Sequence, residues 1–380
     1  LVGSEMCIRD RIIMSNDFKI IAYYLPQFHP FPENDEWWGK GFTEWTNVGK
    51  AKPLFHGHNQ PKVPADLGYY DLRIPSVREE QARLAKEAGV YGFCYWHYWF
   101  GNGKQLLNEI IDDVHASGKP NFPFCLGWAN ESWKAKQWRK DGSGDVLLEE
   151  QVYGGVDEYR RHFDYVLDLF KDPRYIRVDG KPFFLIYKPQ NFPKIEEFMD
   201  YWNKWIKEEG IADKVFFVGN LDDEGDYQKY IHMGFDALTL GRFLKVDYKF
   251  AHANTFKKKL WGWIRKISPF PTFTSYKDLL EYSFLENFES KEDMIPFIIP
   301  NWDHTPRSGK RGEVLLGSNP QSFYEHVLKV LKGVSKKKNK IVMLKSWNEW
   351  GEGNYMEPDL KYGKKYILAL KKALNSFSAK

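Results

Sequence analysis

Short apolar runs alternate with longer amphipathic stretches along most of the chain, beginning at Ile20. Continuous apolar or β-branched runs predict buried strands, and apolar residues spaced three and four apart predict helices that cover them. Repetition of the two patterns is typical of βα units around a parallel sheet. The eight predicted strands are KIIAYYL (19–25), VYGFCYWHY (90–98), FPFCLGW (122–128), PFFLIYK (182–188), VFFVGN (215–220), ALTLG (237–241), IPFIIPN (295–301) and IVMLKSW (341–347).

Helical patterns lie between these strands, and several end at a glycine that can take the left-handed conformation of a helix C-terminus. Eight strands with intervening helices predict an α/β fold of the (β/α)8 TIM barrel type, in which catalytic groups follow the C-terminal ends of strands. A doubly wound open sheet is the alternative, but no GxGxxG follows the first strand. The helical stretches include IPSVREEQARLAKEAG (74–89), GKQLLNEIIDDVHASG (103–118), VDEYRRHFDYVLDLFK (156–171) and QSFYEHVLKVLKG (321–333).

We expect a single domain over residues 14–380, because no internal repeat or low-complexity linker divides the chain. Long loops at 26–71 and 242–294 would decorate the barrel. The segment 1–13 lacks the apolar core of a secretion signal and looks like read-through of sequencing-adapter DNA, so we expect the natural protein to begin at or near Met14.

Composition narrows the range of partners. Hydrophobic residues make up 43% and charged residues 28% of the chain, which is typical of a globular protein with a sizeable core. The formal net charge of +4 comes from interspersed acids and bases, so no nucleic-acid partner is expected. The three cysteines have no zinc-type spacing, and we expect no metal, no cofactor and a cytoplasmic location.

The segments after several predicted strands are rich in aromatic, amide and carboxylate side chains. Aromatic rings offer flat apolar faces to sugar rings, and amides and carboxylates hydrogen-bond sugar hydroxyls, so this clustering predicts a carbohydrate pocket. The alternative for each tryptophan is core packing. Glu44 and Glu131 could also be catalytic acids, but we interpret them as binding residues. The expected substrate-binding residues are His29, Glu44, Trp45, His97, Trp99, Trp128, Asn130, Glu131, Tyr187, Trp302, Asp303, Trp347, Asn348 and Trp350.

The motif WNEWGEG follows the last predicted strand and carries Glu349 and Glu352. Side chains alternate along a strand, so two glutamates three residues apart would face opposite ways if the strand continued. Gly351 and Gly353 allow a sharp turn that brings both carboxyl groups to one cavity. Glycosidic bond cleavage commonly uses two such groups, and we predict that these two are catalytic. A solvated surface turn is the alternative.

Four motifs, YYLPQFHPFPENDEWWGKGFTEWTNV, YGFCYWHYWF, LGWANESW and WNEWGEG, together resemble the WbsX family of bacterial proteins. That family is named as glycosyltransferase-like, is associated with lipopolysaccharide or capsule biosynthesis, and is related to glycoside hydrolase family 99. The resemblance covers about Ile20 to Lys372. It implies a (β/α)8 barrel with a retaining mechanism. Glu349 would act as base on the sugar 2-hydroxyl to give a 1,2-anhydro intermediate, and Glu352 would act as acid and then as base.

The long N-terminal motif matches WbsX-type proteins rather than the mannan-cleaving hydrolases of family 99. The reaction is therefore hydrolysis or sugar transfer on an oligosaccharide or polysaccharide. A noncatalytic glycan-binding barrel is the alternative from another class.

Two further segments admit two interpretations each. FKKKLWGWIRKI (256–267) could be an amphipathic helix in peripheral contact with an anionic inner membrane, which would suit a lipid-linked glycan, or an outer barrel helix. His56 and His58 could ligate a metal, but without further ligands at helical spacing we favour loop histidines that meet sugar or solvent.

Overall fold

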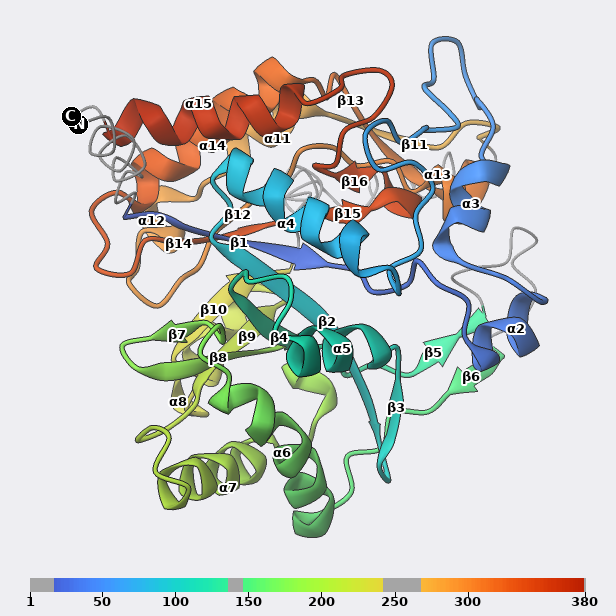
Figure 1. Ribbon diagram of the computed structural model, residues 1–380. Helices are drawn as coiled ribbons and strands as arrows, with labels where there is room; N and C mark the ends of the chain where they lie inside the picture. The colour runs from blue at the N-terminus through green and yellow to red at the C-terminus, as the bar shows by residue number, and fades with distance from the viewer. Residues whose placement is uncertain (1–16, 136–145, 242–267, 379–380) are drawn as a thin grey trace, which may run out of the picture.

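The computed structural model describes residues 17–135, 146–241 and 268–378, in which the chain forms a parallel (β/α)8 barrel (Figure 1). The segment 1–13 and the basic segment 256–267 lie outside the described residues. Eight strands in the described ranges build the barrel: β1 (Lys19–Tyr24), β2 (Gly92–Gly101), β4 (Phe124–Trp128), β8 (Lys181–Ile186), β9 (Phe216–Leu221), β10 (Ala237–Leu240), β12 (Phe297–Ile298) and β14 (Ile341–Leu344).

The strands follow one another around the barrel in chain order. The hydrogen-bonded order is β10-β9-β8-β4-β2-β1-β14-β12, and β1 pairs with β14, so the last strand meets the first. Backbone bonds close the gap between β10 and the residues before β12: Leu238 N donates to Asp293 O and Ile295 N donates to Leu238 O, each at 2.7 Å. This closure rules out an open doubly wound sheet and confirms the predicted barrel.

All eight predicted strands are present, because each apolar run is long enough to fill one barrel position. The seventh is much shorter than predicted, since only Phe297–Ile298 pairs as strand within 295–301.

The predicted helix at 103–118 was wrong in its first half. Asn102 and Gly103 adopt positive φ angles of 51° and 73°, which turns the chain back on itself. The next residues form β3 (Lys104–Leu106), antiparallel to the end of β2, and helix α5 (Glu109–Ser117) starts only after it. Gly89 and Gly118 end α4 and α5 in the left-handed conformation as predicted, whereas Gly333 lies inside α14.

Helices surround the barrel on its outside (Figure 1), with α14, α15 and α4 packed together and α6 against α7. Within the described ranges they are α2 (Pro32–Trp38), α3 (Glu44–Lys50), α4 (Pro75–Ala88), α5, α6 (Val156–Lys171), α7 (Ile195–Glu208), α8 (Tyr227–His232), α11 (Tyr276–Tyr282), α12 (Glu286–Glu289), α13 (Thr305–Ser308), α14 (Pro320–Val334) and α15 (Lys365–Ser378). Single turns of 3₁₀ helix are η2 (Pro189–Asn191), η3 (Glu224–Asp226), η4 (Gly309–Arg311) and η5 (Trp350–Glu352).

Short strands add small sheets to the loops between barrel elements. Besides the antiparallel pair of β2 and β3, three antiparallel pairs and one parallel pair of this kind occur in the described residues. The antiparallel strands are β5 (Trp133–Lys134) with β6 (Leu147–Glu149), β7 (Arg177–Val178) with β8, and β15 (Asn348–Glu349) with β16 (Asn354–Tyr355); the parallel pair is β11 (Thr272–Ser275) with β13 (Glu313–Leu316).

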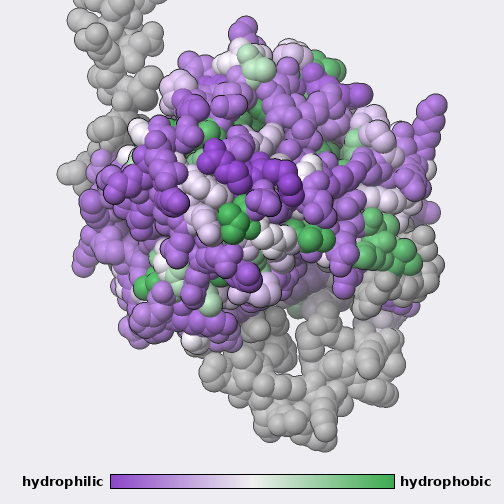
Figure 2. Space-filling view, turned by 90° about the horizontal axis from the view of Figure 1, so that it is seen from below, coloured by the Kyte–Doolittle hydropathy of each residue, from purple (hydrophilic) through white to green (hydrophobic). Residues whose placement is uncertain are grey.

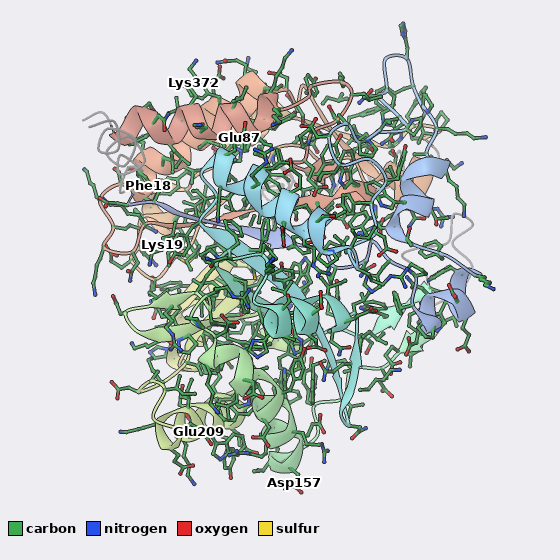
Figure 3. The ribbon with its side chains drawn as sticks, viewed as in Figure 1. Phe18, Lys19, Glu87, Asp157, Glu209 and Lys372 are labelled. Carbon is green, nitrogen blue, oxygen red and sulfur yellow. The ribbon has the colours of Figure 1, made fainter. Side chains whose placement is uncertain are left out.

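Helix amphipathicity directs the packing. On α6, Tyr159, Phe163, Val166 and Phe170 recur at helical spacing and are buried against the barrel. Charged residues such as Asp157 and Glu209 lie on the periphery of the molecule (Figure 3). The face seen in Figure 2 is accordingly mostly hydrophilic, with apolar residues in small separate groups.

Candidate active site

The two glutamates of WNEWGEG lie on a tight hairpin directly after the last barrel strand. Glu349 ends β15, and the turn η5 carries Glu352 before β16 returns antiparallel to β15. Asn348 fixes the base of the hairpin, because its amide oxygen accepts from Leu25 N at 2.7 Å and its amide nitrogen donates to Leu25 O at 3.0 Å. The hairpin is thus tied to the C-terminal end of β1.

The two glycines of the motif serve different purposes. Gly353 ends η5 with φ 60°, a left-handed conformation that reverses the chain. Gly351 does not have a positive φ. A Cβ at Gly351 would lie 1.8 Å from the Glu44 Oε1 atom, so only glycine permits this close approach. The turn predicted from the glycines exists, and one glycine also makes room for a third carboxylate.

A cavity of about 230 Å³, named here the Glu349 cavity, opens at the C-terminal ends of the strands. Its lining combines aromatic rings with amide, hydroxyl and charged groups, which is the mixture that sugar rings require. Its lining residues are Leu25, Gln27, Trp96, Tyr98, Ala129, Glu131, Ser132, Trp133, Tyr187, Arg307 and Glu349.

Arg307 connects Glu352 to Glu44. It lies on α13, after the short strand β12, and its Nε and Nη2 atoms each donate to one carboxylate oxygen of Glu44 at 3.0 Å. Nη1 donates to Glu352 Oε1. His304 also approaches that oxygen, with Nε2 at 3.7 Å. One buried guanidinium therefore pairs with two carboxylates from opposite ends of the chain.

Glu44 is held in place by its helix. It is the first residue of α3, where Thr43 caps the helix and exchanges hydrogen bonds with Thr46 in a capping box. Its side chain is fully buried. Glu44 therefore holds Arg307 in position and is not among the residues that line the Glu349 cavity.

Both catalytic candidates have perturbed acidity. Burial, and then the charge of Glu352, raises the pKa of Glu349 to about 7, while Arg307 and a hydrogen bond of 2.7 Å from Ser346 Oγ oppose the rise. Burial also raises the pKa of Glu352, against the opposing charge of Arg307. Burial lowers the pKa of nearby Lys345 to about 8. Two interacting carboxyl groups with raised pKa values can share one proton.

Glu131 and Tyr187, predicted to bind substrate, line the Glu349 cavity. Burial raises the pKa of Glu131. The Tyr187 ring meets Trp96 edge-on at 5.3 Å, and Trp96 in turn stacks on Tyr23 at 4.8 Å. These rings form an aromatic wall on which a sugar ring can rest.

His97, Trp99 and Trp128 are buried on the other side of the barrel wall, against α6. His97 Nε2 lies 2.8 Å from His162 Nε2, and the Trp99 ring stacks on the His162 ring at 4.6 Å. Trp128 Nε1 donates to Trp99 O at 2.8 Å. Their contacts are those of core residues and not of cavity-lining groups.

Three tryptophans that were predicted to bind substrate instead make packing contacts and hydrogen bonds within the protein. Trp350 stacks on Tyr355 at 3.7 Å and donates to Glu357 at 2.6 Å, and Trp45 packs against Trp350 at 5.5 Å. Trp347 is fully buried beside Phe93.

Two more predicted residues have structural contacts. Asn130 joins the end of β4 to the residues after β8, accepting from Lys188 N at 2.7 Å and donating to Lys188 O at 2.8 Å. His29 is buried, and burial lowers its pKa to about 4. It does not line the Glu349 cavity.

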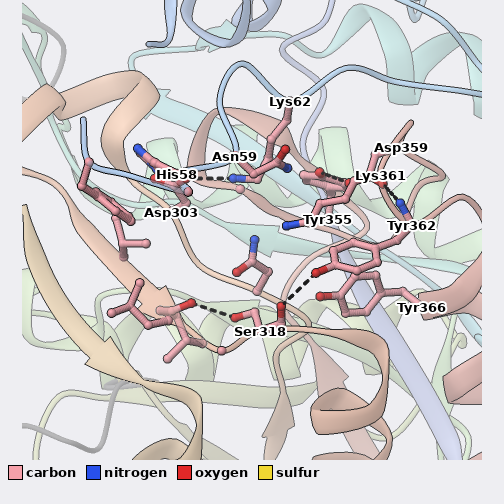
Figure 4. Close-up of a pocket in the computed structure, with 18 residues that line it drawn as sticks. His58, Asn59, Lys62, Asp303, Ser318, Tyr355, Asp359, Lys361, Tyr362 and Tyr366 are labelled. Carbon is pink, nitrogen blue, oxygen red and sulfur yellow. Dashed lines mark hydrogen bonds and ion pairs between the residues drawn. The ribbon is translucent and has the colours of Figure 1, made fainter. Parts of the chain in front are cut away.

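Trp302 and Asp303 follow β12, beyond the hairpin that carries Glu349 and Glu352. Trp302 stacks on His304 at 5.9 Å. Asp303 is buried and lines a second pocket, which Figure 4 shows in close-up. The two residues are thus next to the hairpin but outside the lining of the Glu349 cavity.

Several lining residues were not predicted. Trp96 and Tyr98 belong to the same strand as His97 and Trp99 but have the opposite side-chain parity, and Gln27 donates to the Tyr98 hydroxyl at 3.2 Å. Arg307 belongs to the segment NWDHTPR, in which only the aromatic residue Trp302 and the acidic residue Asp303 were predicted to bind substrate. The available signal for Arg307 was charge balance, because several buried carboxylates require a buried cation.

The described residues contain no group of three or more His, Cys, Asp or Glu side chains arranged to hold a metal ion. In the same part of the chain, no helix combines the length and apolar character needed to cross a bilayer.

Comparison with solved structures identifies the class of fold. A glycoside hydrolase-like protein superposes with a TM-score of 0.59 at 15% identity, covering 94% of each chain. The GH99 endo-alpha-mannosidase from Bacteroides thetaiotaomicron superposes with a TM-score of 0.54 at 15% identity, covering 96% of this chain and 98% of that one. The chain thus has the (β/α)8 fold of GH99-type proteins.

The chain belongs to the family described as Glycosyltransferase WbsX, whose model matches residues 20–370. Two curated relatives, both called uncharacterized protein WxcX, come from two strains of Xanthomonas campestris pv. campestris. Each is 35% identical over 366 residues, covering 93% of this chain and 49% of the relative. The chain therefore spans about half the length of the curated relatives that it matches.

Proposed function

We propose that the protein is a retaining carbohydrate-active enzyme that cleaves or transfers glycosidic bonds in bacterial surface polysaccharide. The observation that carries the proposal is the tight hairpin that holds Glu349 and Glu352 beside an aromatic-walled cavity at the strand ends. Membership of a family named for glycosyl transfer and a GH99-type fold support the same class of chemistry.

The two glutamates would have different roles in proton transfer, Glu349 as a base and Glu352 first as an acid and then as a base. Glu349 borders the cavity, and a pKa of about 7 suits a base that must accept a proton from the sugar 2-hydroxyl near neutral pH. That step closes a 1,2-anhydro ring while Glu352 gives its proton to the departing glycosidic oxygen. Glu352 then takes a proton from the incoming water or hydroxyl as that oxygen attacks the anomeric carbon, and Glu349 returns its proton to the 2-oxygen as the ring opens. Two inversions at the anomeric carbon give net retention.

Arg307 would stabilise the ionised form of Glu352 during this cycle. Its positive charge stabilises the carboxylate that remains after proton donation, and Glu44 holds the guanidinium in position. The other polar lining residues, Gln27, Glu131 and Ser132, would hydrogen-bond sugar hydroxyls.

The proposal is tested by incubating the protein with α-mannosides and with lipid-linked and free bacterial oligosaccharides, and following the anomeric protons by NMR. We expect products whose new anomeric centre has the configuration of the substrate, from attack by water in a hydrolase or by an added sugar acceptor in a transferase. An inverted product would contradict the mechanism. Saturable glycan binding without turnover of any of these substrates would favour a noncatalytic binding barrel.

A further inference from the structure

A second pocket lies on the other side of the catalytic hairpin. It has a volume of about 130 Å³, and we call it the Lys361 pocket (Figure 4). Its polar lining includes His58, Asn59, Lys62, Asn301, Asp303, Asp359 and Lys361, and its apolar walls come from Phe55, Leu315, Leu316, Tyr355, Tyr362 and Tyr366. Aromatic walls with polar groups between them are again suited to a sugar ring.

One of the two acidic groups of the Lys361 pocket, Asp303, is fully occupied by hydrogen bonds within the protein. Asp303 Oδ2 accepts from Gln60 at 2.6 Å, from Lys62 at 2.8 Å and from His58 at 2.9 Å. His58 is the donor in its contact, because its Nδ1 atom accepts from Leu54 N. The other oxygen, Oδ1, accepts from the Thr305 hydroxyl at 2.6 Å and from its backbone N–H at 3.1 Å.

Asp359 is less fully occupied. Its two oxygens accept from the Tyr355 hydroxyl and from Tyr362 N, each at 2.6 Å. Asp303 therefore offers little to a ligand that donates hydrogen bonds, whereas Asp359 keeps about two of its four accepting positions.

The basic groups, in contrast, have donors left over. Lys62 carries three N–H bonds and gives one to Asp303. Lys361 is exposed, lies 5.0 Å from the centre of the Tyr362 ring, and has no ion-pair partner among the described residues. In Figure 4, Lys62 and Lys361 lie on the same side of the pocket as Asp303 and Asp359, and Ser318 lies on the other. An excess of cationic donors over available acceptors selects a ligand with anionic oxygens.

The pocket shares a wall with the catalytic hairpin. Asp303 N donates to Glu352 O at 2.6 Å, and Gly353, which follows Glu352, lines the pocket. A Cβ at Gly353 would lie 2.8 Å from the Asp303 Cβ atom, so the two segments are in close contact. A glycan held at the Glu349 cavity would thus find a second binding point across the hairpin.

We propose that the Lys361 pocket binds an acidic sugar, one that carries a carboxylate or phosphate group, as a subsite for the polysaccharide on which the Glu349 cavity acts. The role as a subsite rests on the proposed function. Binding of the acidic sugar to this pocket does not depend on the proposed function, because binding requires no turnover.

The test is titration of the full chain with glucuronic acid, mannose 6-phosphate and uncharged mannose, followed by protein-observed NMR. We expect at least one acidic sugar to bind at least tenfold more tightly than mannose. Lys361→Glu should weaken that binding at least tenfold. The matched control is Lys204→Glu, an exposed lysine on α7 whose loss should leave the affinity unchanged. Lys361→Gln, which removes the charge without reversing it, should have an intermediate effect.

The outcomes separate the ligand groups and the two sites. Binding of glucuronic acid alone assigns a carboxylate-bearing sugar, and binding of mannose 6-phosphate alone assigns a phosphorylated one. Equal binding of mannose, or full affinity in Lys361→Glu, would overturn the proposal. Glu349→Gln should retain acidic-sugar binding; if it abolishes binding, the acidic sugar occupies the Glu349 cavity and the Lys361 pocket is not its site. Failure of the enzyme assay alone would leave these results unchanged.

Discussion

Glu349→Gln and Glu352→Gln are each expected to lower turnover by about 10²–10⁴-fold, the usual contribution of a positioned acid or base. Glutamine keeps the shape of a protonated glutamate but neither accepts nor releases the proton. Both side chains are in a constrained hairpin whose shape depends on Asn348, Gly351 and Gly353 rather than on the carboxyl charges. The fold should therefore survive, and kcat measured with the NMR assay should fall.

The matched control for both variants is Glu325→Gln. Glu325 is an exposed residue of α14 that accepts from Gln321, so the same chemical change occurs far from the hairpin. Its turnover should equal that of the wild type. If either hairpin variant retained full turnover while the control behaved as expected, the catalytic assignment of that glutamate would be wrong.

Arg307→Met is expected to lower the free energy of unfolding by about 3–5 kcal/mol, because it leaves the buried carboxylates of Glu44 and Glu352 without their cation. Methionine fills much of the same volume, so the loss would be electrostatic rather than a cavity effect. Removal of the positive charge should also raise the pKa of Glu352, since Arg307 opposes the rise that burial causes. Chemical denaturation measures the first effect and the pH dependence of turnover the second.

Arg83→Met is the control for Arg307→Met. Arg83 bridges Glu80 and Glu87 on the exposed face of α4, with about half of its side chain in solvent. Exposed pairs of this kind contribute less than about 1 kcal/mol, so the control should be nearly neutral. Equal losses for both arginines would show that the buried pairing of Arg307 has no special energetic role.

The barrel could be predicted because its signals are local. Each strand is a single apolar run, and α6 was predicted with its observed bounds because its apolar residues recur at helical spacing over sixteen residues. The error at β3 arose where Asn102 and Gly103 reverse the chain, since a turn residue in a left-handed conformation overrides the helical pattern that follows it.

The hairpin that carries Glu349 and Glu352 was predictable for the same reason, because its two glutamates and two glycines are close in sequence. The rest of the cavity was harder. On β2 the aromatic residues occupy both faces, so alternation alone could not decide that Trp96 and Tyr98, rather than His97 and Trp99, face the cavity. If the assumed alternation is shifted by one residue, the residues predicted to face the cavity and those predicted to face the core are exchanged.

Long-range partners were beyond the sequence altogether. Arg307 and Glu44 are 263 positions apart, and nothing in either segment indicates the other. Asn348 and Asn130 were predicted to bind sugar, because an amide can hydrogen-bond either a sugar hydroxyl or the protein backbone. In the structure their hydrogen bonds join strand ends. Gly351 appeared as a turn residue, yet it also admits the Glu44 carboxylate.

The proposed mechanism requires that Glu349 and Glu352 share one electrostatic environment at the cavity. Its most direct test is a carbon-13 NMR titration of carboxyl-labelled glutamate, with the Glu349 signal assigned by its disappearance in Glu349→Gln. We predict that Glu349 titrates at about 7 in the wild type, and at a lower pH in Glu352→Gln because the neighbouring negative charge is gone. Titration of Glu349 near its ordinary value of 4.5 in both proteins would contradict the account.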